Sequence, residues 1–297
     1  MKKLLLVYNP TAGKMLFGNK LNEIIDYYTK QNYIVTVYPT QAREDGYVFV
    51  KAYAQQYDLI VCAGGDGTLN EIVSAVLDAD ADKAIGYIPC GSTNDFARSV
   101  GIPAAIDEAM IVPCEGCAAA VDIGWFNDKY FVYVAGFGLF TNVAYATPQK
   151  MKNSLGYLAY ILEGIKALTD VQPYNITLEY EQETITGGFI IGLVMNSFSV
   201  GGFKSPFHSL THLEDGLFEV ILVRMPKNIA DLQMIIGALL NGDIMSEYVV
   251  CIQSADLRIT SQPLDWTLDG EYGGTYEMVH IQNKHKAIQI MTKVEVL

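Results

Sequence analysis

Short apolar runs alternate with helix-like patterns through about the first 120 residues of the chain. The runs are typical of buried strands, each is followed by Gly, Pro or Asn, and they cover Leu4–Tyr8, Val35–Tyr38, Leu59–Ala63 and Ile85–Ile88. Between them, apolar residues recur at helical spacing, at Leu21, Ile24, Ile25 and Tyr28 and again at Leu69, Ile72, Val73, Val76 and Leu77. This alternation predicts a parallel, three-layer α/β domain, in which ligands bind at the carboxyl ends of the strands.

The pattern changes after about Asp122, where strand-like runs separated by Gly, Asn and Asp turns dominate. The runs are Lys129–Ala135, Phe189–Met195, Leu217–Val223 and Val249–Ile252, and helical patterns interrupt them at Leu155–Leu168 and Ile229–Leu240. We therefore predict two domains, an α/β domain over residues 1–122 and a mostly antiparallel β-sandwich over residues 123–297, whose last strand could return to the first domain. The cleft between two such domains is the expected active site.

Composition narrows the classes of function. The chain has 297 residues, is 51% hydrophobic and 18% charged, and carries a net charge of -13. A disordered chain is excluded by the hydrophobic content, and a nucleic-acid partner by the charge, because phosphate binding needs a basic face. No run approaches the ~20 apolar residues of a membrane span, and five cysteines, an odd number, favour a reducing compartment. We expect a cytoplasmic protein whose membrane contact is peripheral.

The sharpest motif follows the third predicted strand and consists of Gly64, Gly65, Asp66, Gly67, Thr68, Leu69, Asn70 and Glu71. Its glycines would let backbone N–H groups approach phosphate oxygens. Thr68 and Glu71 have the spacing of a capping box, which would begin a helix where anions bind best. Asp66 has no evident structural task and could hold Mg²⁺ beside the phosphates. The alternative is an ordinary glycine turn before a capped helix.

Three more loops follow strands on the same side of the predicted sheet. The first contains Asn9, Pro10, Thr11, Ala12 and Gly13, Thr40 follows the second strand, and Ser92, Thr93 and Asn94 follow the fourth. Ser92 or Thr93 could cap the next helix. Each loop alone could be an ordinary connection, but four such loops at one edge predict a nucleotide site.

These motifs, in this order, resemble the diacylglycerol kinase catalytic-domain family, in particular its bacterial lipid kinases, which are related to sphingosine kinases. The resemblance runs over almost the whole chain and implies an ATP- and Mg²⁺-dependent lipid kinase of phospholipid metabolism. It also implies an α/β nucleotide domain like that of NAD kinases and phosphofructokinases, followed by a β-sandwich. Two positions depart from the family pattern, Ser92 in place of Thr and Tyr272 in place of Pro.

The resemblance also assigns roles to acids in the second domain. Asp215, with backbone oxygens of His212 and Leu217, would form a Mg²⁺ site, and Glu271 would be the general base that takes the proton from the lipid hydroxyl. Both acids stand in Asp-Gly turns, Asp215-Gly216 and Asp269-Gly270-Glu271, and a plain turn is the alternative for each.

Two other functions remain open. NAD kinases share the Gly-Gly-Asp-Gly loop but lack the two acid motifs of the second domain, and a non-catalytic lipid-binding or regulatory protein would not need Asp66, Asp215 and Glu271. The acceptor could be diacylglycerol, ceramide, phosphatidylglycerol or undecaprenol. The expected partner is a lipid presented at a membrane surface, and a homodimer is compatible with the sequence.

Overall fold

The computed structural model describes residues 1–12, 17–139, 172–197, 199–200, 203–204, 212–228, 230–235 and 247–293. The chain divides into two compact units. The first comprises Met1–Ile123 with His285–Leu297, and the second comprises Gly124–Lys284. The predictions for Gly13 and for a helix over Leu155–Leu168 fall outside the described residues, and of the predicted helix Ile229–Leu240 only residues 230–235 are described, as helix.

The first unit is built on a parallel sheet with the order β2-β1-β3-β4. Its strands are β1 (Lys2–Tyr8), β2 (Tyr33–Pro39), β3 (Leu59–Gly64) and β4 (Ala84–Pro89). The end of β15 (Glu271–Thr292) adds a parallel pairing beside β4, through Gln289 and Ile290. All four predicted strands are confirmed, and β3 is buried along its whole length, as expected for a strand covered on both faces.

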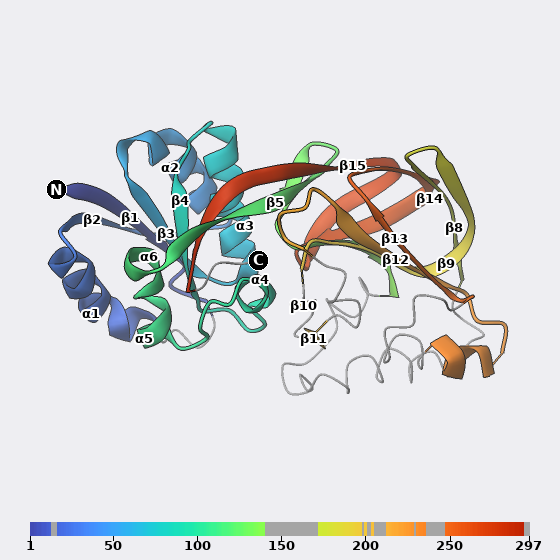
Figure 1. The fold of residues 1–297 in the computed structure, drawn as a ribbon, viewed down its shortest axis with the longest axis horizontal. Coiled ribbons are helices and arrows are strands. Elements are labelled where there is room, and N and C mark those ends of the chain that lie inside the picture. The colour runs from blue at the N-terminus through green and yellow to red at the C-terminus, as the bar shows by residue number, and fades with distance from the viewer. Residues whose placement is uncertain are drawn as a thin grey trace. The chain divides into compact units, whose positions relative to one another are not determined.

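Helices cover both faces of this sheet (Figure 1). They are α1 (Phe17–Lys30), α2 (Asp45–Tyr53), α3 (Asp66–Asp78), α4 (Asp95–Ser99), α5 (Ile106–Ala109) and α6 (Val112–Glu115), with a 3₁₀ turn η1 (Ala54–Gln56). From β1 the chain moves outward to β2, whereas from β3 it moves outward to β4 on the opposite side of the sheet. Because both connections are right-handed, α1 lies on one face and α3 on the other. Ligands of open α/β sheets bind at such a switch point, beyond the carboxyl ends of the strands.

Among the described residues, the strands of the second unit pair in antiparallel fashion. The strands are β6 (Lys129–Phe131), β7 (Val134–Gly138), β8 (Tyr174–Tyr180), β9 (Glu183–Met195), β10 (Ser199–Val200), β11 (Phe203–Lys204), β12 (Phe218–Arg224), β13 (Val249–Ser254) and β14 (Asp256–Leu268), with most of β15. Strand β5 (Cys117–Phe126) begins in the first unit and ends in the second. The long strands β9 and β14 each pair with β8 along one half and with β7 along the other, which closes the four strands into a ring.

An apolar core lies within this second unit. Trp266 is 1% exposed and makes edge-to-face contacts with Phe126 and Phe137, with ring centroids 5.1 and 5.0 Å away. Leu178 and Val220 belong to the same buried cluster. The observed fold is thus mixed α/β with extensive sheet, as predicted at that level.

One predicted strand is interrupted. The run Lys129–Ala135 was expected to be continuous, but β6 ends at Phe131 and β7 begins at Val134. The reason is a side chain far along the sequence, because the N–H groups of Val132, Tyr133 and Val134 all donate to the carboxylate of Asp269. Among the described residues, no helix is long and apolar enough to span a membrane.

Candidate active site

Backbone hydrogen bonds join the loops that follow the first four strands. The N–H of Asn9, just after β1, donates to the Ala63 carbonyl at 2.9 Å, and the Thr40 N–H, just after β2, donates to the Tyr8 carbonyl at 2.9 Å. The Cys90 N–H donates to the Gly64 carbonyl at 2.7 Å. The predicted nucleotide loops therefore meet at one edge of the sheet, and the first of these bonds lies at the switch point between β1 and β3.

Two glycines allow the loops after β3 and β4 to touch. A Cβ built on Gly91 would lie 2.6 Å from the Cα of Gly65, a distance that no real side chain tolerates. The buried Tyr87 hydroxyl donates to the Gly64 carbonyl at 3.2 Å, and burial raises the pKa of Tyr87 well above its ordinary value, so the donor stays protonated. Glycine at positions 65 and 91 is therefore explained by close backbone approach.

The capping box predicted for Thr68 and Glu71 is wrong. Helix α3 begins at Asp66, its N-cap is Gly65, and the Leu69 N–H donates to the Gly65 carbonyl at 3.0 Å. Thr68 thus lies inside the first turn, where its side chain packs against Gly64. The Glu71 carboxylate instead accepts the N–H of Glu44 at 2.9 Å, which ties the start of α2 to α3.

Asp66 has a structural task that the sequence did not reveal. Its side chain is 8% exposed, and its carboxylate accepts the N–H groups of Asp95 at 3.2 Å and Phe96 at 3.4 Å, with the Thr93 hydroxyl at 3.3 Å. The carboxylate thus supplies acceptors at the N-terminus of α4, which carries unsatisfied donors. The role of Asp66 in holding Mg²⁺ stays a prediction.

The loop after β4 also differs from its prediction. The N-cap of α4 is Asn94, which has a φ of 50°, so neither Ser92 nor Thr93 is the cap residue. The Asn94 side chain bonds back to Gly91, accepting its N–H at 2.8 Å and donating to its carbonyl at 3.2 Å. Ser92 is exposed.

The first loop is organised by one amide. The Asn9 side-chain oxygen accepts the N–H of Thr11 at 2.9 Å and its hydroxyl at 2.8 Å, and the Ala12 N–H donates to the Asn9 carbonyl at 3.2 Å. Pro10 lies within this turn, where its fixed φ is tolerated. The loop is therefore pre-formed next to the loop after β3.

A buried acid that the sequence interpretation passed over stands in the same region. Asp95 is fully buried at the start of α4, and its backbone N–H binds Asp66. The signal available in the sequence was its position one residue after Asn94, within the loop already singled out. Two buried acids, Asp66 and Asp95, are thus joined by a hydrogen bond at this edge of the sheet.

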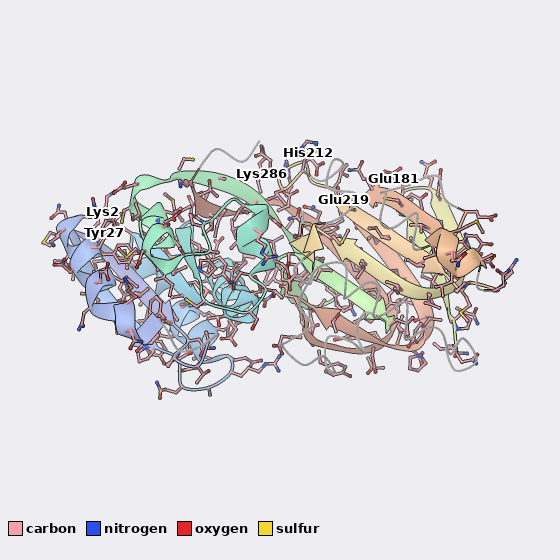
Figure 2. All side chains as sticks on the ribbon, turned by 90° about the horizontal axis from the view of Figure 1, so that it is seen from below. Lys2, Tyr27, Glu181, His212, Glu219 and Lys286 are labelled. Atoms are coloured by element: carbon pink, nitrogen blue, oxygen red, sulfur yellow. The ribbon has the colours of Figure 1, made fainter. Side chains whose placement is uncertain are left out.

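In the second unit, Asp215 stands in a turn just before β12. Its Oδ1 accepts the N–H of Leu217 at 2.9 Å, and Gly216 has a φ of 81°, so these residues form a turn. The metal role of Asp215 stays a prediction. Asp215 is exposed, and a carboxylate offers about four acceptor positions, so one internal bond leaves capacity for a cation. His212 is also exposed (Figure 2), whereas Glu219 farther along is fully buried.

Glu271 begins β15 directly after a two-residue turn. Leu268 pairs with Glu271, and the intervening Asp269 and Gly270 have φ angles of 50° and 83°. Positive φ at both positions is the signature of the type I′ hairpin, for which Asp-Gly is a preferred pair. Glu271 and its neighbour Tyr272 are exposed.

The sheet brings the two acid motifs to one edge of the second unit. In register, Glu219 at the start of β12 pairs with Met195 at the end of β9, which pairs with Val134 at the start of β7. The Asp269 N–H donates to the Val134 carbonyl at 2.8 Å. The turns of Asp215 and Glu271 are therefore separated by β9 and β7, or roughly 14 Å at the usual strand spacing.

Known proteins are similar to this chain over nearly its whole length. The family profile described as "Diacylglycerol kinase catalytic domain" matches residues 3–126. The diacylglycerol kinase of Bacillus subtilis (strain 168) is 33% identical, with 98% of this chain and 99% of the relative covered. The chain belongs to the diacylglycerol kinase family. The diacylglycerol kinase of Staphylococcus carnosus (strain TM300) is 32% identical, with 99% of this chain and 96% of the relative covered.

A solved structure extends the likeness to the fold. A diacylglycerol kinase from Bacillus anthracis str. Sterne matches with a TM-score of 0.79 and 20% identity, and the match covers all of this chain and 98% of that one. At 20% identity this comparison shows that the two chains share a fold, and it does not extend to their substrates.

Two cysteines of this member of the diacylglycerol kinase family stand at CxxC spacing, Cys114 and Cys117. Cys114 and Cys117 are free, the Cys117 thiol lies 3.8 Å from the Thr292 carbonyl, and burial raises the pKa of Cys114 to about 11. Over the described ranges, no cluster of three or more His, Cys, Asp or Glu side chains could hold a metal ion.

Proposed function

We propose that the protein is an ATP- and Mg²⁺-dependent kinase that phosphorylates a hydroxyl of a diacylglycerol-like lipid. One observation carries this proposal. In a chain of the diacylglycerol kinase family, the loops after β1, β3 and β4 are joined at the switch point of a parallel sheet, around the contact between Gly65 and Gly91.

ATP would bind at this edge of the first unit. The Gly64–Glu71 motif forms the start of α3, and the N-terminus of a 13-residue helix attracts anions through its N–H groups and its dipole. Asn9 and Thr40 stand on the neighbouring loops and could complete the phosphate site. The residues present fit a nucleotide, because the glycines at positions 64, 65 and 67 carry no Cβ that would keep phosphate oxygens away from backbone N–H groups.

Magnesium also suits the donors present. Mg²⁺ prefers oxygen ligands and keeps several waters, so one or two carboxylates suffice to hold it. Asp66 is an acid of the phosphate loops, and Asp215 is an exposed acid of the second unit, with His212 and Leu217 offering carbonyl oxygens. When bound, Mg²⁺ would neutralise charge on the transferred phosphoryl group.

Glu271 would accept the proton of the lipid hydroxyl. It is exposed at the start of β15, where its carboxylate can reach a substrate, and a positioned general base contributes about 10²–10⁴-fold to rate. Membrane contact would be peripheral, since the acceptor is presented at a lipid surface. The finer fold assignment that we favour is an NAD kinase-like first unit with a β-sandwich as the second.

The proposal is tested by supplying radiolabelled ATP and Mg²⁺ to the purified protein with a panel of acceptors. The panel contains diacylglycerol, ceramide, phosphatidylglycerol and undecaprenol in mixed micelles, and NAD in solution. We expect label in diacylglycerol and none in NAD. Labelling of NAD without any lipid would favour NAD kinase, and ATP binding without any transfer would favour a regulatory protein.

The base is tested by Glu271→Gln, which keeps size and hydrogen bonding but cannot take up the proton. We expect normal Mg-ATP binding by calorimetry and a kcat lower by about two to four orders of magnitude. Glu277→Gln is the matched control, since Glu277 is an exposed acid on the same strand. A loss confined to KM for the lipid would instead identify Glu271 as a residue that binds the acceptor.

A further inference from the structure

The carboxylate of Asp269 lies in an unusual position for a residue of a hairpin turn. Hairpin turns are commonly exposed, yet Asp269 is only 6% exposed. Its Oδ2 accepts the Val132 N–H at 2.7 Å, and its Oδ1 accepts the N–H groups of Tyr133 at 2.9 Å and Val134 at 3.1 Å. One side chain therefore satisfies three consecutive backbone donors.

The turn itself does not require this carboxylate. A type I′ hairpin accepts Asn-Gly at least as readily as Asp-Gly, because both permit positive φ at its first position. A buried negative charge is costly unless donors surround it, and three short N–H bonds to an ionised group are the arrangement that offsets this cost. The charge of Asp269 is thus explained by its partners at residues 132–134 and not by the turn.

Asp269 both accepts and donates hydrogen bonds that fix the turn. Besides the three bonds to the side chain, the Asp269 N–H donates to the Val134 carbonyl at 2.8 Å, so four hydrogen bonds join this residue to one short segment. The segment is the break between β6 and β7, anchored on either side by strand pairing. Glu271 follows two residues later, so its backbone position depends on these bonds.

We propose that Asp269 is a positioning residue that fixes the Asp269-Gly270 turn so that Glu271 is held where the acceptor hydroxyl binds. The inference rests on the proposed function, in which Glu271 is the general base. Asp269 itself touches no substrate in this scheme. It acts by keeping the base within the narrow range of geometry that proton transfer needs, where a displacement of about 1 Å can cost roughly 10²-fold in rate.

The test is Asp269→Asn combined with Glu271→Gln. Asparagine keeps the turn and the size, and its oxygen can still accept from Tyr133 and Val134, but its NH₂ group cannot accept from Val132. We expect kcat to fall by about 10- to 100-fold with the affinity for Mg-ATP unchanged. Asp265→Asn is the matched control, because it makes the same charge change at an exposed position of the same hairpin.

The double variant separates positioning from general stabilisation of the fold. If Asp269 acts through Glu271, adding Asp269→Asn to Glu271→Gln should lower kcat by less than about 2-fold, because the base is already absent. A further loss equal to that of the single variant overturns the positioning role, as does an unchanged kcat in Asp269→Asn. A wild-type protein without lipid kinase activity refutes the proposed function itself, a result distinct from additivity in an active enzyme.

Discussion

Asp66→Asn is the substitution for which structure and sequence give different expectations. From the sequence alone, the change should abolish turnover and leave the fold intact. In the structure, the carboxylate accepts two N–H groups and one hydroxyl at the N-terminus of α4, so the change should also affect stability. Asparagine keeps one acceptor oxygen and turns a donor toward at least one of these partners.

The size of the effect follows from these contacts. Hydrogen bonds to ionised groups contribute about 1.5–3 kcal/mol each at good geometry, and these three, at 3.2 to 3.4 Å, should lie near or below the lower limit. Losing one bond and exposing its buried donor to an NH₂ group should therefore cost about 1–3 kcal/mol of unfolding free energy. If Asp66 also holds Mg²⁺, the folded variant should in addition show a kcat lower by about 100-fold or more.

Urea unfolding, calorimetric Mg-ATP binding and kcat with saturating diacylglycerol would measure the three effects in one preparation. Asp82→Asn, at an exposed position, controls for the change of charge. Thr93→Val removes the hydroxyl donor alone and should cost less stability than Asp66→Asn. Native stability in Asp66→Asn would refute the contribution to α4, and native kcat in a folded variant would refute the metal role.

Three further substitutions test other parts of the site. Gly91→Ala places a Cβ 2.6 Å from the Cα of Gly65 and should weaken ATP binding at least about 10-fold by calorimetry, whereas Gly18→Ala, which meets no atom within 4 Å, should not. Burial raises the pKa of Glu71 above its ordinary value, so this carboxyl holds its proton more tightly in the folded protein than in the unfolded chain. The stability that the protonated carboxyl contributes at low pH is therefore lost as pH rises through the raised pKa. Glu71→Gln should then be at least as stable as wild type at pH 8, and its urea midpoint should change less with pH between pH 4.5 and 8 than that of wild type. A larger change of the midpoint with pH in Glu71→Gln would contradict the raised pKa of Glu71. Mg²⁺ without nucleotide should raise the melting temperature of wild type but not of Asp215→Ala, and equal shifts would remove Asp215 from the metal site.

The periodic pattern was sufficient for the parallel sheet but not for every helix. The predicted apolar runs of the first unit form its four strands. Helical spacing locates α1, which buries Ile24 and Tyr28, and α3, which buries Leu69, Ile72, Val73 and Val76. Helix α2 escaped prediction because its Tyr-Val-Phe-Val run, Tyr47–Val50, has the β-branched and aromatic composition of a strand. Packing against α3, where Gly46 meets Ile72, overrides that local preference.

The strands of the second unit were harder to find. The longest, β15, has 22 residues, and its buried positions alternate with partly exposed ones only in short stretches, such as residues 288–292. Its partner also changes along the way, from β14 over Glu271–Gln282 to β4 at Gln289. A local hydrophobic pattern reports which face is buried but not against which strand, so neither the length nor the change of partner could be predicted.

In the candidate site, residue types were predictable and their partners were not. Thr68 and Glu71 have capping-box spacing, but Gly65 could equally begin the helix, and contact with Gly91 favours the earlier start. The donors that surround Asp66 lie 27 to 30 residues farther along the chain. No spacing rule reaches across such a distance, because those contacts depend on the order of the strands.

The two Asp-Gly turns of the second unit differ in where the N–H donors to the Asp carboxylate come from, and this difference decides whether the carboxylate can bind a cation. Asp215 accepts one N–H from its own turn and is exposed, so its carboxylate retains capacity for a cation. Asp269 accepts three N–H groups from residues 132–134 and is buried, so most of its acceptor positions are occupied within the fold. The same dipeptide thus predicts opposite responses to metal. If this reasoning holds, the Mg²⁺-dependent rise in melting temperature should survive in Asp269→Asn and disappear in Asp215→Ala, and loss of the rise in both would mean that the two turns share one site.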